Sequence, residues 1–455
     1  MKISLHLWLT LLPVGMALGW QSTPKYQLAH FSADVTIPLN HRCMGVLPTK
    51  SKKIVDRLYA HGLALLGPEK PIVFCAVDWC EIRNGSYEKW RTALALAAGT
   101  ERERVILSAL HQHDAPVVDD GAAKLLQEVG LEGELFDQAF QDQTVSRVAQ
   151  LLKESLTNAQ PVTHYAIGQS KVMKIASNRR VVSPESGRVS FSRGSSSGRN
   201  PEFAQAPSGR IDPYLKTISF WNQEKPLLAM HSYATHPMSY YGRGEVSSDF
   251  VGLARLKRQR DDKTIKQIYF SGCSGDVTAG KYNDGSQLMR NELTSRLYQG
   301  MVSSWKTNRR FELGAVKFKN EKLQLPFHEK RSLQEASLTR TLHDRQAPTE
   351  KRILAAMGLA SLHRVQKKIP IDLPMIDLGQ AKIILFPGET FVGYQLMAQE
   401  MAAGAFVFSI GYGECWPGYI PTQSAFADGF EDNWLWAGRG SETLIRKSLS
   451  RLLDP

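Results

Sequence analysis

Residues 105–116 read VILSALHQHDAP, an apolar run that leads directly into two histidines. The run has no helical spacing and predicts a buried β-strand over Val105–Leu110. His111 and His113 lie two positions apart, so on an extended chain both side chains project to the same face. Ligands of α/β proteins usually bind at the carboxyl ends of strands, which makes the pair a candidate site. The pair alone is equally compatible with a structural or surface role.

Apolar runs and helically spaced segments alternate along most of the chain. The predicted strands are 71–77, 105–110, 164–167, 215–221, 226–233 and 266–270, and the predicted helices are 87–98, 136–156, 287–305, 333–345, 351–367, 392–401 and 441–453. This alternation predicts an α/β fold: a single large domain with a central mixed or parallel β-sheet, buried on both faces and flanked by helices.

Two segments interrupt this rhythm. Residues 183–209 are rich in Ser, Gly, Arg and Pro and predict a long mobile loop rather than a domain linker. Residues 332–367 form a charged helical pair, which we interpret as an insertion covering one side of the sheet.

The composition limits the classes of protein to which the chain can belong. A chain of 455 residues with 42% hydrophobic residues can bury a sizeable core. The formal net charge of +12 would allow peripheral association with an anionic membrane or cell-wall polymers. The basic residues are scattered and no nucleic-acid-binding module is recognisable, so nucleic acid is not an expected partner.

The N-terminus predicts export. Lys2 precedes an apolar run, and small residues end at Gly19, so we expect residues 1–19 to be a signal peptide and the mature protein to be secreted or periplasmic. An uncleaved membrane anchor is the alternative. The sequence leaves the pairing of the five cysteines open: Cys43, Cys75, Cys80, Cys273 and Cys415.

Further polar residues follow later strands. His236 precedes Pro237 at a strand-to-loop edge, whereas His231 lies inside the strand and is interpreted as a hydrogen-bonded core histidine. Asp249 is expected to cap the following helix rather than to orient a ligand. In the small-residue loop 271–280, Asp276 and Thr278 could face a pocket, although a tight glycine loop without chemistry is the simpler interpretation.

The C-terminal part supplies a carboxylate and an aromatic loop. Glu389 follows Pro387-Gly388 immediately after an apolar strand, a fixed position that is unusual for an exposed glutamate. Residues 412–419 then form a glycine-rich aromatic loop that ends at Tyr419.

Taken together, these motifs resemble the neutral ceramidase family, zinc amidases that cleave the N-acyl bond of ceramide. The resemblance covers residues 28–455 and the motifs come in the family's order. The matching segments are Leu110-His-Gln-His-Asp-Ala-Pro116, Asn178-Arg-Arg180, His236-Pro237, Ser247-Ser-Asp249, Gly275-Asp-Val-Thr-Ala-Gly280, Pro387-Gly-Glu389 and Tyr419-Ile-Pro-Thr422.

The resemblance implies a zinc ion and a division of roles. The implied zinc ligands are His111, His236, Glu389 and Tyr419. The implied catalytic or substrate-positioning residues are His113, Arg179, Asp276 and Thr278. Zinc would lower the pKa of a bound water towards about 7 and polarise the substrate carbonyl. The expected substrate is an N-acylated lipid or small molecule.

The departures from the family's motifs concern residues that are expected to line the substrate pocket. Thr278 stands in place of a family serine, and Phe430 stands where a second pocket tyrosine is expected. We also expect the family's C-terminal β-sandwich domain to be absent. Three hypotheses remain open: a ceramidase, a zinc hydrolase of the same fold with a different amide or ester substrate, and a secreted zinc-binding protein that has lost catalysis.

Overall fold

Most of the strands fall into three larger sheets. The computed structural model describes residues 25–402 and 404–454, so the expected signal peptide lies outside the described residues. The first sheet has the order β6-β4-β3-β1-β8, built from β1 (Tyr26–Asp34), β3 (Tyr59–Leu66), β4 (Ile72–Val77), β6 (Val105–Ala109) and β8 (Gln160–Val162). Only its β4–β6 pair is parallel.

The other two sheets are mixed as well. The second has the order β16-β14-β13-β9-β18, with β9 (His164–Lys171), β13 (Tyr214–Asn222), β14 (Lys225–Tyr233), β16 (Lys266–Ser271) and β18 (Arg309–Glu312). The third has the order β19-β20-β21-β23, with β19 (Lys317–Leu323), β20 (Ile371–Asp377), β21 (Ala381–Leu385) and β23 (Phe406–Ile410). The parallel pairs are β14–β16 and β21–β23.

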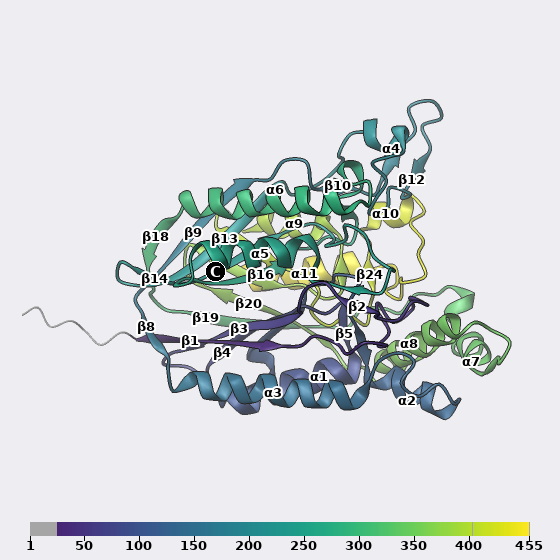
Figure 1. Ribbon diagram of the computed structural model, residues 1–455, viewed down its shortest axis with the longest axis horizontal. Helices are drawn as coiled ribbons and strands as arrows, with labels where there is room; N and C mark the ends of the chain where they lie inside the picture. The colour runs from purple at the N-terminus through teal and green to yellow at the C-terminus, as the bar shows by residue number, and fades with distance from the viewer. Residues whose placement is uncertain (1–24, 403, 455) are drawn as a thin grey trace, which may run out of the picture.

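Helices cover the outer faces of these sheets (Figure 1). α1 (Asn84–Ala98) and α3 (Gln138–Leu156) pack on the first sheet, and α5 (Asp249–Asp261) and α6 (Gln287–Lys306) pack on the second. α11 (Ser441–Leu453) packs on β19 and on α9 (Val392–Met401). The remaining helices are α2 (Asp120–Glu128), α4 (Pro201–Gln205), α7 (Glu335–His343), α8 (Thr349–Gln366) and α10 (Gln423–Ala427).

One apolar cluster joins the three sheets. Phe74 of the first sheet, Met230 of the second and Ile383 of the third belong to it, and each is fully buried. The apolar runs of the sequence are therefore explained by strands that are covered on one side by helices and on the other by a neighbouring sheet.

Short strand pairs lie at the carboxyl ends of the parallel strands. Those that Figure 1 labels are at the right of the picture. The pairs are β2 (Lys53–Ile54) with β15 (Glu245–Val246), β5 (Glu81–Arg83) with β7 (Val117–Asp119), β10 (Ser177–Asn178) with β17 (Val277–Thr278), β11 (Val181–Val182) with β12 (Val189–Ser190), and β22 (Glu389–Thr390) with β24 (Tyr419–Ile420). Several of these pairs contain the candidate site residues.

The predicted α/β class and a single fold are confirmed, but the one central sheet is replaced by several mixed sheets. The helical pair 332–367 does not lie over a sheet as expected, because α8 packs mainly on α7 and α2. Residues 183–209 contain α4 and β12, which pairs with β11 immediately before the segment, and buried Arg193 donates hydrogen bonds to the carbonyls of Asn178, Ala206 and Pro207. Mobility of this segment stays a prediction.

Two further expectations can be compared with the described residues. All five cysteines are buried free thiols, so the possible disulfides are not formed. Across residues 25–402 and 404–454, the structure contains no helix with the length and apolar character that crossing a membrane requires.

The close contact of β1, β3 and β4 gives a stability prediction. A Cβ atom at Gly62 would lie 2.1 Å from Phe31 Cζ and 2.4 Å from the carbonyl oxygen of Phe74. We expect Gly62→Ala to lower the free energy of unfolding by about 1–3 kcal/mol or more, because strands in a packed core cannot separate freely. Chemical denaturation followed by circular dichroism measures the effect.

Gly314→Ala is the matched control. A Cβ at Gly314 meets nothing within 4 Å, so this variant should unfold within about 0.5 kcal/mol of the parent chain. Equal stability of the two variants would contradict the packing of β3 between its neighbours.

Candidate metal centre

The candidate residues follow strands that belong to parallel pairs. His111 comes after β6, His236 after β14 and Glu389 after β21. Asp276 and Thr278 follow β16 in the same way. Parallel strands end at the same edge of a sheet, so these side chains, which are far apart in the sequence, meet at one end of the fold.

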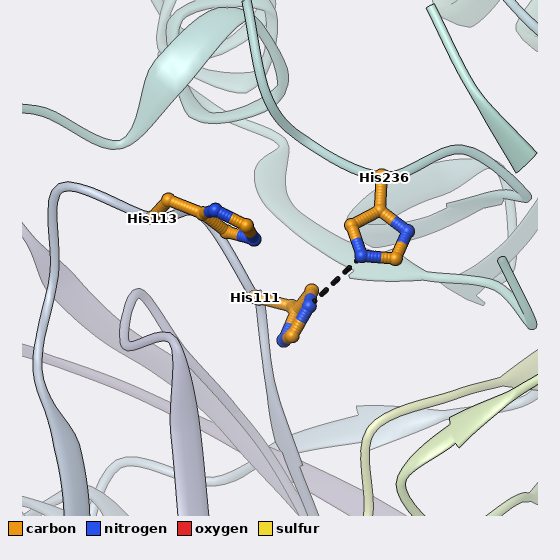
Figure 2. Close-up of side chains that lie close together, drawn as sticks. All are labelled: His111, His113 and His236. Carbon is orange, nitrogen blue, oxygen red and sulfur yellow. Dashed lines mark hydrogen bonds between the residues drawn. The ribbon is translucent and has the colours of Figure 1, made fainter. Parts of the chain in front are cut away.

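Three of the four predicted metal ligands form a close triangle. His111 Nε2 lies 3.1 Å from His236 Nε2, and Glu389 Oε2 lies 3.3 Å from the first nitrogen and 3.0 Å from the second. Tetrahedral bonds of about 2.0–2.1 Å would separate ligand atoms by about 3.3 Å, close to these spacings. All three side chains are buried, and Figure 2 shows the two imidazoles turned toward each other.

Backbone carbonyls fix the orientation of both imidazoles. His111 Nδ1 lies 3.0 Å from the carbonyl oxygen of Cys80, and His236 Nδ1 lies 2.6 Å from that of Ser274. A carbonyl can only accept, so each Nδ1 carries the proton and donates it. In the neutral ring, each Nε2 therefore carries a lone pair directed at the centre of the triangle, as in histidine metal ligands whose second nitrogen is held by the protein.

The charges around the triangle favour an anionic carboxylate. Burial acts to raise the pKa of Glu389, but His111 and His236 outweigh burial and hold this pKa well below its usual range. Burial, aided by the Arg179 cation, lowers the pKa of His236 to about 4, which keeps this imidazole neutral. Burial also acts to lower the pKa of His111, yet Glu389 dominates and the pKa is raised. A neutral imidazole beside a carboxylate is a donor set suited to zinc.

His113 joins the same cluster from the other side. One ring nitrogen of His113 lies within 4.8 Å of ligand nitrogens of both His111 and His236. Its Nδ1 is buried and has no hydrogen-bond partner among the described residues. Burial and the two neighbouring histidines hold the pKa of His113 well below its usual value, so the ring is a neutral proton acceptor.

Tyr419 and Arg179 border Glu389 and His236. Tyr419 pairs with Glu389 in the two-stranded β22–β24 sheet, and the centre of its ring lies 6.3 Å from that of His236. The Arg179 guanidinium lies 5.4 Å from the centre of the Tyr419 ring, and its Nη2 is 3.4 Å from His236 Nε2. The structure therefore brings both predicted residues to the triangle.

Asp276 and Thr278 are occupied by structural hydrogen bonds. The Asp276 carboxylate accepts from the backbone N–H of Val392 and from the Asn178 amide, both at 2.8 Å. The buried Thr278 hydroxyl donates to the Gly194 carbonyl at 3.1 Å and accepts from the Gly280 N–H at 3.0 Å. These contacts fix loops around the site, and they leave the predicted catalytic roles of the two residues as predictions.

The small-residue loop before Asp276 packs against the backbone of Glu389 rather than facing an open pocket. A Cβ at Gly275 would lie 2.1 Å from the carbonyl oxygen of Glu389. Glycine is required here because the loop and the Glu389 backbone pack directly on each other. The loop therefore helps to position the carboxylate.

Glu81 is a site residue that sequence reasoning missed. One of its carboxylate oxygens lies within 4.8 Å of ligand atoms of His111 and Glu389. The fully buried carboxylate accepts hydrogen bonds from Arg83 at 2.8 Å and from the Trp434 indole at 2.9 Å. The alternation Glu81-Ile-Arg83 within an apolar context was the available signal, since it places both charged side chains on one face of a strand.

Tyr412 was recognised only as part of an aromatic loop. Its ring stacks on His111 with centroids 4.2 Å apart and planes at 17°. Its hydroxyl lies 2.8 Å from Ser274 Oγ, in the same loop whose carbonyl holds His236. Tyr412 thus supports both histidines of the triangle.

The two other polar residues of this region have structural partners. His231 is fully buried between Thr217 Oγ1 at 2.9 Å and Gln267 Oε1 at 2.8 Å, as expected for a core histidine. Asp249 does not act as a conventional cap; its carboxylate accepts from the backbone N–H groups of Phe250 and Ser239, so it ties α5 to the loop after His236.

Comparisons with known proteins identify the fold. No protein-family model matches the chain, and no curated protein matches it in sequence. Among solved structures, the chain is similar to a neutral ceramidase from Pseudomonas aeruginosa, with a TM-score of 0.67 and 16% identity, covering 95% of this chain and 74% of that chain. A ceramidase complexed with C2 gives a TM-score of 0.66 and 15% identity, covering 95% and 75%. The chain therefore has the fold of the neutral ceramidases, as the sequence motifs predicted.

Proposed function

We propose that this chain is a zinc-dependent hydrolase that cleaves the N-acyl bond of an amide. The observation that carries the proposal is the buried triangle of His111 Nε2, His236 Nε2 and Glu389 Oε2, with separations of 3.0 to 3.3 Å. Its position at the strand ends of a neutral ceramidase fold supports the same assignment.

The donor set fits a zinc ion. Glu389 Oε2 is buried and has no partner with hydrogen-bond geometry among the described residues, although two imidazole nitrogens lie near it. An unsatisfied buried carboxylate oxygen is costly, and a cation at the centre of the triangle removes that cost. We propose Tyr419, which pairs with Glu389 in the β22–β24 sheet, as the fourth ligand. Zinc, when bound, would polarise the substrate carbonyl and activate a water molecule.

The remaining residues supply proton transfer and charge stabilisation. His113 is neutral with an unpaired Nδ1, so it can accept a proton from the attacking water and pass it to the leaving nitrogen. The Arg179 guanidinium stands next to His236 and can stabilise negative charge that develops on the carbonyl oxygen. The Thr278 hydroxyl and the Asp276 carboxylate both bind backbone groups of neighbouring segments. We therefore propose that these two residues hold the loops that border the site.

Two further parts of the proposal concern the substrate and the location of the protein. The substrate is an N-acylated lipid or small molecule and is not restricted to ceramide, because Phe430 and Thr278 change the substrate side of the site. Export of the mature chain, with peripheral binding to an anionic membrane or cell wall, is proposed on the sequence of residues 1–19 and the net charge of +12.

Metal content tests the ligand assignment. We expect the purified chain to contain about one zinc per molecule, and His111→Ala and His236→Ala to lose most of it, because each variant removes one nitrogen of the triangle. His231→Gln is the matched control: it changes another buried histidine, which hydrogen-bonds to Thr217 and Gln267, and should retain zinc. Full zinc in both triangle variants, measured by mass spectrometry, would refute the site.

Turnover measurements test the proposed roles of His113 and Arg179. Hydrolysis of N-acyl amides should be lost with a chelator and restored by zinc. We expect His113→Ala to lower kcat by about 10²–10⁴-fold and Arg179→Met by about 10²–10³-fold with zinc retained. Arg180→Met is the control, since Arg180 pairs with Asp428 and should leave kcat within about twofold. If the zinc-loaded chain hydrolyses no amide or ester, the hypothesis of a non-catalytic zinc protein is favoured.

A further inference from the structure

The loop that follows His236 places an aromatic side chain over the metal centre. Tyr241 lies in this loop, and its ring meets the ring of His113 edge to face, with centroids 4.7 Å apart and planes at 68°. Tyr241 is 38% exposed, whereas His113 is 7% exposed. Tyr241 therefore lies between His113 and the solvent on one side of this ring, which is turned toward the two other histidines in Figure 2.

A buried arginine holds the residues before Tyr241. Arg290 on α6 donates hydrogen bonds to Ser239 Oγ at 2.6 Å and to the Tyr240 carbonyl at 2.9 Å. The same guanidinium lies 3.5 Å from the centre of the Tyr240 ring. Charge-assisted hydrogen bonds and a cation–π contact on one short segment fix its backbone.

The residue after Tyr241 is held from the other side. The Gly242 backbone N–H donates to Asp114 Oδ1 at 3.0 Å, and Asp114 directly follows His113 in the chain. The loop is thus tied to the segment that carries His113. Because both neighbours of Tyr241 are fixed, its ring has a defined position beside His113 rather than the freedom of an exposed loop side chain.

The phenol of Tyr241 is available to a ligand. No hydrogen-bond partner is found for its hydroxyl among the described residues, and its ring packs edge to face on His113. Burial raises the pKa of Tyr241 and Arg179 opposes this shift, so the phenol is protonated at neutral pH. A fixed, protonated and unpaired phenol is a hydrogen-bond donor for an oxygen atom of the substrate.

We propose that Tyr241 determines substrate specificity by donating a hydrogen bond to an oxygen on the amine half of the substrate. This inference rests on the proposed function, in which His113 passes a proton to the leaving nitrogen. Tyr241 packs on His113, so the substrate group nearest its hydroxyl is the amine half. Preferred substrates carry a hydroxyl or carboxylate close to the scissile nitrogen, as in N-acyl amino alcohols and N-acyl amino acids.

Three amides with one acyl chain test the proposal: N-lauroyl ethanolamine, N-lauroyl glycine and N-lauroyl ethylamine. The parent chain should favour one or both oxygen-bearing amides over the ethylamide by about 5–10-fold in kcat/KM, the value of one hydrogen bond. The member that is preferred distinguishes a hydroxyl from a carboxylate acceptor. Tyr241→Phe should remove this preference and leave kcat/KM for the ethylamide within about twofold.

Tyr240→Phe is the matched control, because it removes the neighbouring phenol oxygen but keeps the ring that packs on Arg290. It should keep the preference of the parent chain. An equal loss on all three amides in Tyr241→Phe, or no loss on any, would overturn the proposal. If no amide is turned over, the proposed function fails, and dissociation constants for the same amides replace kcat/KM. The absence of a Tyr241-dependent preference in binding then overturns this inference as well.

Discussion

Hydrogen bonds between the ends of three strands bring the candidate site together. Ser108 at the end of β6 donates to the Gly411 carbonyl beyond β23, and Ser271 at the end of β16 donates to the Leu110 carbonyl beyond β6. The Gly411 N–H returns a hydrogen bond to the Ser271 carbonyl. One strand from each larger sheet is therefore fixed to the other two immediately before the loops that carry His111, Ser274 and Tyr412. The junction positions His111 directly and His236 through its hydrogen bond to the Ser274 carbonyl.

Buried charges next to the junction make the site rigid. Arg83 is fully buried between Glu81 and Asp119 and lies 4.3 Å from the centre of the Trp436 ring. Removing one partner of such a network leaves an uncompensated buried charge, which typically costs about 3–5 kcal/mol. Glu81 reaches from this network toward His111 and Glu389, so the charges that stabilise the fold also fix the charge around the triangle.

Local sequence patterns predicted many of the helices and strands, and the structure places the predicted site residues at one end of the fold. The helix predicted over 392–401 has these bounds, and the strand predicted over 105–110 ends one residue earlier, at Ala109. Strand pairing could not be predicted, because an apolar run buried under a helix is indistinguishable from one buried under another sheet. The unusual backbone of the site was also hidden: His111 and Tyr412 have φ values of +74° and +56°, which depend on tertiary contacts rather than on periodicity.

The site residues that sequence reasoning did not resolve depend on partners distant in the chain. The Asp276 carboxylate binds the start of α9 through Val392, a contact that no local pattern of the sequence indicates. Glu81 resembled an ordinary charged residue until Trp434, more than three hundred positions away, was seen to bind it. Motif order could single out the histidines and Glu389, because each of them directly follows a strand end. It could not assign side chains whose role is to hold other loops.

X-ray absorption at the zinc edge tests the metal centre most directly. The proposed site predicts a first shell of nitrogen and oxygen ligands at about 2.0–2.1 Å, with outer-shell scattering from two imidazoles. A sulfur donor is also close to the site, because Cys80 Sγ lies 4.0 Å from His111 Nδ1. A sulfur shell at about 2.3 Å, or a purified chain that takes up no zinc, would contradict the His111, His236 and Glu389 centre.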